Sequence, residues 1–423
     1  MHPSWRRNRW GQSRQPKDYV TTPLVNNVFK SADALYKRQM KSPMATMRGQ
    51  VVAMLLDCTA RTWGSREEMH LQFSRALISR GVRPVLVFSE NIPQELRDKY
   101  EANGVDVAPA INYESGIFNY YRELGKVIRN YSVTAVHIAF FNYFSLIPWL
   151  ARLRGVRYIV YHERNPGVIR AKSWKRRLLQ LRGRLATLPV TRVAAISQFI
   201  KQQLVEVGVP ERRISLVYNG VDARRYSPDP TAKEQLAKAL SIRPEEIILA
   251  TLSYLKPHKN IDVIIEACQQ LTERGVACRL LVIGEGMMRC EWEALAEKLG
   301  IADRIHWLGH VSDPIPILQG CDAFLMVSMG EGFGLALAEA MACGTAVVAT
   351  RSGALNEIVE DGNSGLLVPP RDVSALADAI EKLAKDEGKR RQMARRGTER
   401  VRRHYTVEAS IEKMMNVYET MWS

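Results

Sequence analysis

The sequence predicts an α/β fold built from two Rossmann-like domains. Apolar strand candidates alternate with helical stretches in both halves of the 423 residues, and turn formers interrupt the alternation near the middle. Strands that alternate with helices are typical of parallel sheets covered on both faces. The length also fits two domains of roughly 200 residues each better than it fits one core.

The first half contains four apolar runs that predict the strands of one sheet. These runs lie at 50–57, 83–89, 135–140 and 157–162. Helical stretches separate them. Ser65 and Glu68 have the spacing of a capping box, which predicts the start of the helix after the first strand.

The second half repeats the alternation. Its six apolar runs lie at 247–253, 279–284, 304–309, 323–328, 345–350 and 364–369. Before them, "NGVDARRYSPDPT" at 219–231 combines turn formers with two prolines, which predicts a hinge. We therefore expect an N-terminal domain at 49–222 and a C-terminal domain at 223–403. The apolar spacing within the final segment, 404–423, predicts a helix.

Residues 1–48 lack clear periodicity and carry ten Lys or Arg against Asp18 and Asp33. We expect a flexible basic extension, or a start placed too early, with Met44 or Met47 as the alternative first residue. A second basic patch, 164–192, has nine Arg or Lys and no acid. These patches account for the net charge of +16 on an otherwise balanced chain. Without a basic groove or aromatic–basic motifs, we expect no nucleic-acid binding.

Location and metal content can also be predicted. No apolar run approaches the roughly 18 residues of a membrane-spanning helix. The N-terminus has no apolar signal region, so we expect a cytoplasmic protein. The six cysteines show no CxxC spacing and mostly sit in apolar contexts, as reduced core residues would. The histidines form no metal-binding motif, so we expect no metal.

The stretch "EGFGLALAE", from Glu331 to Glu339, sets two acids on either side of a glycine-rich loop. A helix over 335–343 would place its N-terminus, which favours negative charge, after this loop. Phosphate fits that position, whereas carboxylates suit hydroxyl groups. A nucleotide sugar would satisfy all of these groups. The alternative is that Glu339 is a solvated helix position and Glu331 a loop acid.

Longer blocks of the chain resemble a known family. The segment "SMGEGFGLALAEAMACGTAVVATRSGALNEIVEDGNSGLLVPPRD" is similar to the donor-site signature of retaining glycosyltransferases of the GT-B fold, family GT4. "YLKPHKNIDVIIEA", "LLVIGEG" and "LGHVSD" resemble other blocks of that family in the same order. The resemblance spans 50–423 and implies two Rossmann-like domains that face a central cleft. It also implies that the final helix crosses back to the N-terminal domain.

The resemblance implies roles for residues in the second half. Glu339 would hold the ribose hydroxyls of the nucleotide, and Glu331 would contact the donor sugar near the reacting carbon. Lys259 would neutralise the leaving diphosphate, or else be a solvated loop lysine. Backbone amides of the donor loop would contact the diphosphate and sugar. That loop comprises Gly332, Phe333, Gly334 and Leu335.

In the first half, His162 matches the histidine that faces the donor sugar in the family, or else it is bonded to backbone at a strand end. Gly64 falls in the glycine loop that approaches the phosphates, where the family often has two adjacent glycines. A further departure is Tyr254, preceded by Ser253, where the family usually has Gly-Arg. The family's arginine joins the lysine in holding the diphosphate, and His258 or an N-domain base is the expected replacement.

The implied activity is transfer of a sugar from a nucleotide sugar, UDP- or GDP-linked, to a sugar or lipid-linked acceptor. The resemblance implies retention of configuration, no cofactor and no metal, in polysaccharide, glycolipid or other glycoconjugate biosynthesis. The alternative is a nucleotide-sugar-binding protein that has lost turnover, because Tyr254 carries no positive charge.

The segment 171–186, "AKSWKRRLLQLRGRLA", predicts an amphipathic helix inside the second basic patch. Trp174, Leu178, Leu181 and Leu185 share one face. Either this face lies on an anionic membrane, at the inner side of the cell membrane, or it packs on the N-terminal sheet.

Overall fold

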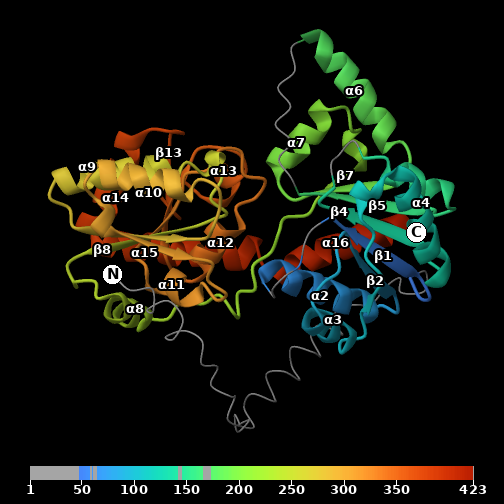
Figure 1. Ribbon diagram of the computed structural model, residues 1–423, viewed down its shortest axis with the longest axis horizontal. Coiled ribbons are helices and arrows are strands. Elements are labelled where there is room, and N and C mark those ends of the chain that lie inside the picture. The colour runs from blue at the N-terminus through green and yellow to red at the C-terminus, as the bar shows by residue number, and fades with distance from the viewer. Residues whose placement is uncertain (1–46, 58–59, 61–63, 142–144, 165–172, 423) are drawn as a thin grey trace, which may run out of the picture. The chain divides into compact units, whose positions relative to one another are not determined.

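The computed structural model describes residues 47–57, 60, 64–141, 145–164 and 173–422. Within this part of the chain, two parallel sheets each have helices on both faces (Figure 1). This confirms the predicted α/β class with two Rossmann-like sheets. The basic segment at 1–46, with the alternative start Met44, and Cys58 lie outside the described residues.

The first sheet has seven parallel strands in the order β3-β2-β1-β4-β5-β6-β7. Its strands are β1 (Val51–Leu56), β2 (Arg83–Phe88), β3 (Asp106–Val107), β4 (Ala135–Ala139), β5 (Tyr158–Glu163), β6 (Arg192–Ala195) and β7 (Ile214–Leu216). Its helices are α2 (Ser65–Ile78), α3 (Gln94–Glu101), α4 (Ile117–Asn130), α5 (Ile147–Leu153), α6 (Ser173–Thr187) and α7 (Gln198–Glu206). The four predicted strands are confirmed, whereas β3, β6 and β7 were not predicted because each has only two to four residues.

The second sheet has six parallel strands in the order β10-β9-β8-β11-β12-β13. They are β8 (Ile247–Leu252), β9 (Cys278–Ile283), β10 (Ile305–Gly309), β11 (Ala323–Met326), β12 (Ala346–Thr350) and β13 (Leu366–Val368), so all six predicted runs are strands. Its helices are α8 (Ala232–Leu240), α9 (Ile261–Glu273), α10 (Arg289–Lys298), α11 (Ile315–Gly320), α12 (Leu335–Ala342), α13 (Leu355–Ile358), α14 (Val373–Lys385) and α15 (Glu387–His404). Nearly continuous burial of the central strands is what a sheet covered on both faces requires.

Both strand orders contain one point where the direction of winding reverses. In the first sheet this point lies between β1 and β4, and in the second it lies between β8 and β11. Ligands of open parallel sheets bind outside the carboxyl ends of strands at such switch points, because the two flanking loops leave in opposite directions. The loops after β8 and β11 are therefore the first place to look for a binding site.

The chain passes between the two sheets twice, and the two passages lie side by side. Val221, on the outward passage, forms a parallel bridge with Thr406 on the return. Gly220 comes so close that a Cβ atom there would lie 2.3 Å from the Cα of Val407. Only glycine fits this approach.

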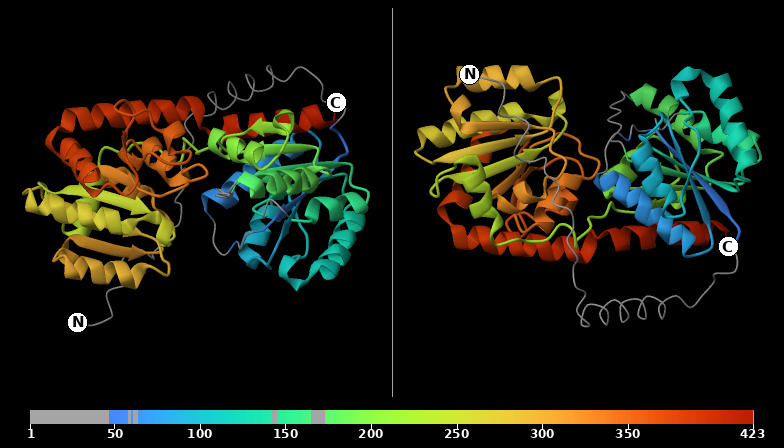
Figure 2. Two further views of the ribbon diagram at one scale, coloured as in Figure 1. Left: turned by 90° about the horizontal axis from the view of Figure 1, so that it is seen from above. Right: turned by 60° about the horizontal axis from the view of Figure 1, so that its bottom comes forward.

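After the return, α16 (Val407–Trp422) packs on the core of the first sheet. Its buried face includes Met414, Met415 and Tyr418, which join a cluster with β1 and α2 residues such as Met54 and Leu71. Figure 2 shows α16 in red beside α2 in blue. The last helix therefore supplies side chains to the interior of a domain built from the start of the chain.

The predicted capping box at the start of α2 is wrong by one residue. The N-cap is Gly64, and the Glu67 carboxylate accepts its backbone N–H at 3.2 Å. Ser65 is already the first helical residue. Glu67 takes the capping position in the structure, where it is buried and also binds Arg66.

Candidate donor-binding site

The loops after β8 and β11 meet at the switch point of the second sheet. Lys259 ends the short turn η4 (Pro257–Lys259) after β8, and Glu331 follows β11. The Lys259 Nζ atom lies 2.5 Å from Glu331 Oε1, and both side chains are 17% exposed. The two residues that resemblance assigned to the diphosphate and the sugar thus touch each other, although 72 positions separate them.

Backbone and side-chain bonds hold these two loops together. Asn260, in the left-handed region at φ 50°, donates from its side chain to the carbonyl of Val327 at 3.0 Å. The Met329 amide donates to the carbonyl of His258 at 2.9 Å. A lysine and a glutamate carried on loops fastened in this way are positioned before any ligand arrives.

Two glycines, one in the donor loop and one packed against it, are required by the geometry of the site. Gly334 is the N-cap of α12 at φ 96°, and a Cβ atom there would lie 2.6 Å from the Leu355 side chain. Gly353, at φ 58°, lies against the Glu331 carbonyl, where a Cβ would approach to 2.5 Å. The predicted helix is confirmed, and its first-turn amides start beside Glu331.

Phe333 holds the loop through its side chain. The ring is buried against Tyr218 at 6.3 Å and Tyr405 at 5.7 Å between ring centroids. Tyr218 in turn donates its hydroxyl to Glu357, whose carboxylate accepts the first backbone amides of α7. Of Phe333, therefore, only the backbone is available for a ligand, which agrees with a role for its amide.

Glu339 lies in a different place from Glu331. It is buried on α12 and lines a cavity with residues of α2 and of the two passages between the sheets. The other lining residues include Glu68 and Gln72 of α2 and Asp222 and Arg225 of the outward passage. The solvated-helix alternative for Glu339 is wrong, because the carboxylate is inside the protein, where it needs polar partners.

His162 is the next-to-last residue of β5 and belongs to a buried cluster. Its Nδ1 lies 3.2 Å from Nε2 of His137 on β4, and His137 Nδ1 lies 2.8 Å from the hydroxyl of Tyr418. His70 of α2 lines the same small cavity as both histidines and Arg164. The alternative in which His162 bonds to backbone has no support among the described residues, where its ring partner is another histidine.

All three histidines of this cluster are neutral at pH 7. Burial, together with the charge of the nearby Arg164, lowers the pKa of His137 to about 3. Burial, then Arg164, also holds the pKa of His70 and His162 well below the usual range. The charged form of an imidazole is disfavoured both by the apolar surroundings and by a neighbouring cation.

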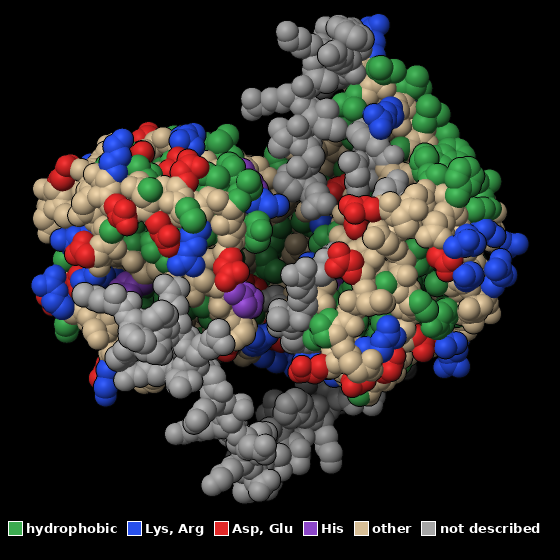
Figure 3. Space-filling view, viewed as in Figure 1, with side chains coloured by type: hydrophobic (Ala, Val, Ile, Leu, Met, Phe, Trp, Pro, Cys, Tyr) green, Lys and Arg blue, Asp and Glu red, His purple; other side chains and the backbone are tan. Residues whose placement is uncertain are grey.

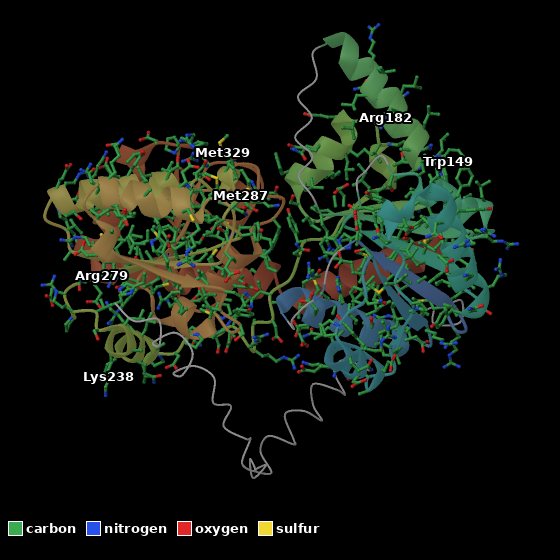
Figure 4. All side chains as sticks on the ribbon, in the orientation of Figure 1. Trp149, Arg182, Lys238, Arg279, Met287 and Met329 are labelled. Atoms are coloured by element: carbon green, nitrogen blue, oxygen red, sulfur yellow. The ribbon has the colours of Figure 1, made fainter. Side chains whose placement is uncertain are left out.

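Tyr254 stands where the family usually has arginine. Its side chain is 61% exposed, and the ammonium of Lys256 lies 5.3 Å from the ring centroid. Figure 4 labels two other exposed residues of this domain, Met287 after β9 and Met329 after β11. His258, the first replacement cation that we expected, is favoured in its neutral form here, because burial and the charge of Lys259 lower its pKa.

Gly64 precedes α2 at the carboxyl end of β1, beside the switch point of the first sheet. Residues 61–63 before it lie outside the described residues. The cation nearest in sequence is Arg66, whose guanidinium binds Glu67 at 2.8 Å.

Sequence reasoning missed His137, His70 and Tyr418. A histidine in the apolar run "AVHIAF" was a signal, since a buried polar side chain requires a partner. No spacing in the sequence could pair it with a tyrosine 281 positions away.

Across the described residues there is no group of His, Cys, Asp and Glu that could hold a metal ion. Four of the described cysteines are buried and form no disulfide, as predicted, whereas Cys290 is exposed. In the same part of the chain, no helix has both the length and the apolar character needed to cross a bilayer.

Two family models match consecutive parts of the chain. Residues 68–225 match glycosyltransferase family 4, and residues 232–400 match glycosyl transferases group 1. The fold is the GT-B fold of glycosyltransferases. The chain belongs to the family 4, group 1 glycosyltransferases.

Named relatives agree with this membership. The chain is 33% identical over 231 residues to N-acetyl-alpha-D-glucosaminyl L-malate synthase of Bacillus anthracis, a match covering 54% of this chain and 58% of the relative. It is 33% identical over 219 residues to D-inositol 3-phosphate glycosyltransferase of Corynebacterium urealyticum, covering 49% and 51%. The matched region thus spans little more than half the length of these relatives.

Solved structures share the fold at lower identity. Anabaena Alr3699/HepE in complex with UDP and glucose has a TM-score of 0.73 at 19% identity, covering 88% of this chain and 100% of that chain. WaaG, a glycosyltransferase involved in lipopolysaccharide biosynthesis, has a TM-score of 0.66 at 18% identity, covering 86% and 99%.

Proposed function

We propose that this protein transfers a sugar, with retention of anomeric configuration, from a UDP- or GDP-linked donor to an acceptor. The observation that carries the proposal is the meeting of Lys259 with Glu331 at a switch point, beside the start of α12. Family membership and a fold neighbour that binds UDP and glucose support a nucleotide sugar as the donor.

The residues of the site suit the electronic demands of this reaction. As the bond between the sugar and the diphosphate breaks, negative charge grows on the diphosphate and positive charge on the sugar ring. Lys259 and the first amides of α12 would stabilise the diphosphate, and Glu331 would offset the charge on the sugar. We propose that these groups provide the positive potential without a metal ion. The ion pair between Lys259 and Glu331 must separate when the nucleotide sugar binds, because the Lys259 ammonium would then contact the diphosphate in place of Glu331.

Substitution of Glu339 tests which end of the nucleotide sugar lies beside this residue. We expect its buried carboxylate to accept the ribose hydroxyls, so Glu339→Gln should weaken binding of the nucleotide sugar and of the free nucleotide alike. A hydrogen bond to a charged group contributes about 1.5–3 kcal/mol, so the expected loss of affinity is roughly ten- to a hundredfold. Glu331→Gln should instead lower turnover and leave the affinity for free nucleotide nearly unchanged.

The measurement is calorimetry with UDP and GDP on the wild type and both variants, after a thermal-shift screen of nucleotide sugars has found the donor. Unchanged nucleotide affinity in Glu339→Gln would refute the ribose assignment. If both variants lose nucleotide affinity equally, the separate roles of the two glutamates are wrong.

A nucleotide-sugar-binding protein without turnover is the second candidate function. The exposed Tyr254 and the neutral His258 favour it, because Lys259 is then the one cation of η4 that would face the diphosphate. Sugar transfer also explains why Glu331 lies beside Lys259. A carboxylate there can offset positive charge on the sugar as its bond to the diphosphate breaks, but it would not help to hold a diphosphate.

We further propose that α6 brings this protein to an anionic membrane, where a lipid-linked acceptor would lie. Leu178, Leu181 and Leu185 are 62%, 55% and 50% exposed. The alternative prediction, in which these leucines pack on the N-terminal sheet, is therefore wrong. The helix packs inward through Leu179, Gly183 and Thr187 instead. The side chain of Trp174 lies outside the described residues.

The surface extends beyond α6. Trp149 of α5 donates its indole N–H to the carbonyl of Leu185, and Leu153 of α5 is exposed as well. Figure 3 shows hydrophobic side chains with Lys and Arg along this side, and Figure 4 labels Trp149 and Arg182 there. Exposed leucines among bases, without an acid on α5 or α6, fit the boundary of an anionic bilayer.

Vesicle sedimentation tests this surface. The wild type should sediment with phosphatidylserine-containing vesicles at low salt and less at high salt, whereas a Leu178→Ser, Leu181→Ser, Leu185→Ser variant should stay in the supernatant. Val205→Ser, at another exposed apolar residue, is the matched control. Equal recovery of wild type with neutral and anionic vesicles would refute the proposal, as would a leucine-dependent dimer in place of membrane binding.

A further inference from the structure

The buried chain of Tyr418, His137 and His162 has a direction. Two contacts and one unpaired atom define it. The Tyr418 hydroxyl contacts His137 Nδ1, and His137 Nε2 contacts His162 Nδ1, whereas His162 Nε2 has no partner among the described residues. Because a neutral imidazole carries one N–H, the direction of each hydrogen bond fixes which nitrogen of the next ring holds the proton.

Burial keeps all members of the chain neutral. The pKa of Tyr418 is raised well above its usual range by burial, so its oxygen keeps its hydrogen. The lowered pKa values of His137 and His162 mean that neither ring carries a second proton. Two arrangements of the hydrogens are then possible.

In the first arrangement, Tyr418 donates to His137 Nδ1, and His137 Nε2–H donates to His162 Nδ1. One group, the N–H at Nε2 of His162, is then left without a partner. In the second arrangement all bonds run the other way, so the buried Tyr418 O–H has no acceptor and His162 Nε2 is an unpaired acceptor. Each unpaired buried polar group costs free energy. The first arrangement leaves one such group and the second leaves two, so the first is preferred.

We propose that Tyr418 and His137 are positioning residues that hold the Nε2–H tautomer of His162, so that His162 donates a hydrogen bond to a ligand oxygen and does not act as a base. This rests on the proposed function, in which the ligand is the donor sugar and the oxygen is one of its hydroxyls. Tyr418 belongs to the last helix, so the end of the chain sets the hydrogen-bonding character of a residue in the first sheet.

The cavity beside these rings agrees with such a role. It has a volume of about 30 Å³, and its mostly apolar lining includes His70, His137, His162 and Arg164. A cavity of this size holds one or two water molecules and excludes a sugar ring. A sugar hydroxyl at the mouth of the cavity can replace one of these waters. When no sugar is bound, a water can accept the same hydrogen bond from the His162 N–H.

Imidazole ¹⁵N NMR of the ligand-free protein tests the tautomer without any assumption about activity. We expect His137 and His162 to show the Nε2–H pattern in the wild type, and Tyr418→Phe to shift both toward a mixture. Tyr161→Phe is the matched control, because it removes another buried hydroxyl from the neighbouring position of β5. An Nδ1–H pattern at His162 in the wild type, or an unchanged pattern in Tyr418→Phe, would overturn the proposal.

Donor binding tests the consequence. Tyr418→Phe should weaken donor affinity about two- to tenfold, since only part of the population would present the N–H. In a His162→Gln background, where the amide N–H is itself the donor, Tyr418→Phe should have no further effect, so the two changes are non-additive. Additive losses would overturn the proposal that Tyr418 and His137 position His162. If the tautomers are as expected but no nucleotide sugar binds, the proposed function fails while the positioning of His162 by Tyr418 and His137 stands.

Discussion

At the scale of single residues, Tyr254 lies where the resemblance implies an arginine. Arginine at this position would contribute a second cation to the diphosphate, whereas tyrosine offers one hydroxyl and no charge. The structure leaves the ring 61% exposed, with Lys256 close to its face. An arginine side chain would therefore fit here without displacing the core.

We expect Tyr254→Arg to leave turnover unchanged or to raise it. An added cation can strengthen binding of the leaving diphosphate, but Lys259 and the amides of α12 already stabilise it. The measurement is release of nucleoside diphosphate with the donor found in the screen, and Tyr254→Phe is the control without charge. If wild type binds a donor without turnover and Tyr254→Arg restores release, the binding-protein function replaces the transferase.

At the scale of elements, the donor loop depends on the left-handed conformation of Gly334. We expect Gly334→Ala to destabilise the protein by about 2–4 kcal/mol, because backbone strain and a contact of the new Cβ with Leu355 add together. Gly275→Ala is the matched control, since Gly275 has φ 76° but no atom within 4 Å of the added Cβ. Denaturant unfolding should show the larger loss for Gly334→Ala, and equal losses would contradict the role of the close contact.

The elements themselves were largely predictable from the sequence. Long buried strands such as β8 and β12 are continuous apolar runs, so their positions follow from composition alone. The short strand β3 has two residues, and its existence depends on pairing with β2. The start of α2 was misjudged because the choice between Ser65 and Gly64 as N-cap depends on where the Glu67 side chain is buried.

At the scale of the whole molecule, the order of strands decides which residues meet. Lys259 and Glu331 come together because β8 and β11 are neighbours, although β9 and β10 lie between them in the sequence. Resemblance predicted both residues but gave no distance between them. The contact between Tyr418 and His137 could not be predicted at all, because it depends on how α16 packs on the first sheet.

The most direct test of sugar transfer is the release of nucleoside diphosphate by wild type and Lys259→Ala, measured with a donor that raises the melting temperature. We expect wild type to release nucleoside diphosphate in the presence of an acceptor, and Lys259→Ala to do so roughly 100-fold or more slowly, the scale for losing one charge-stabilising donor. Equal rates in the two proteins, or no release by wild type with any acceptor, would contradict the account.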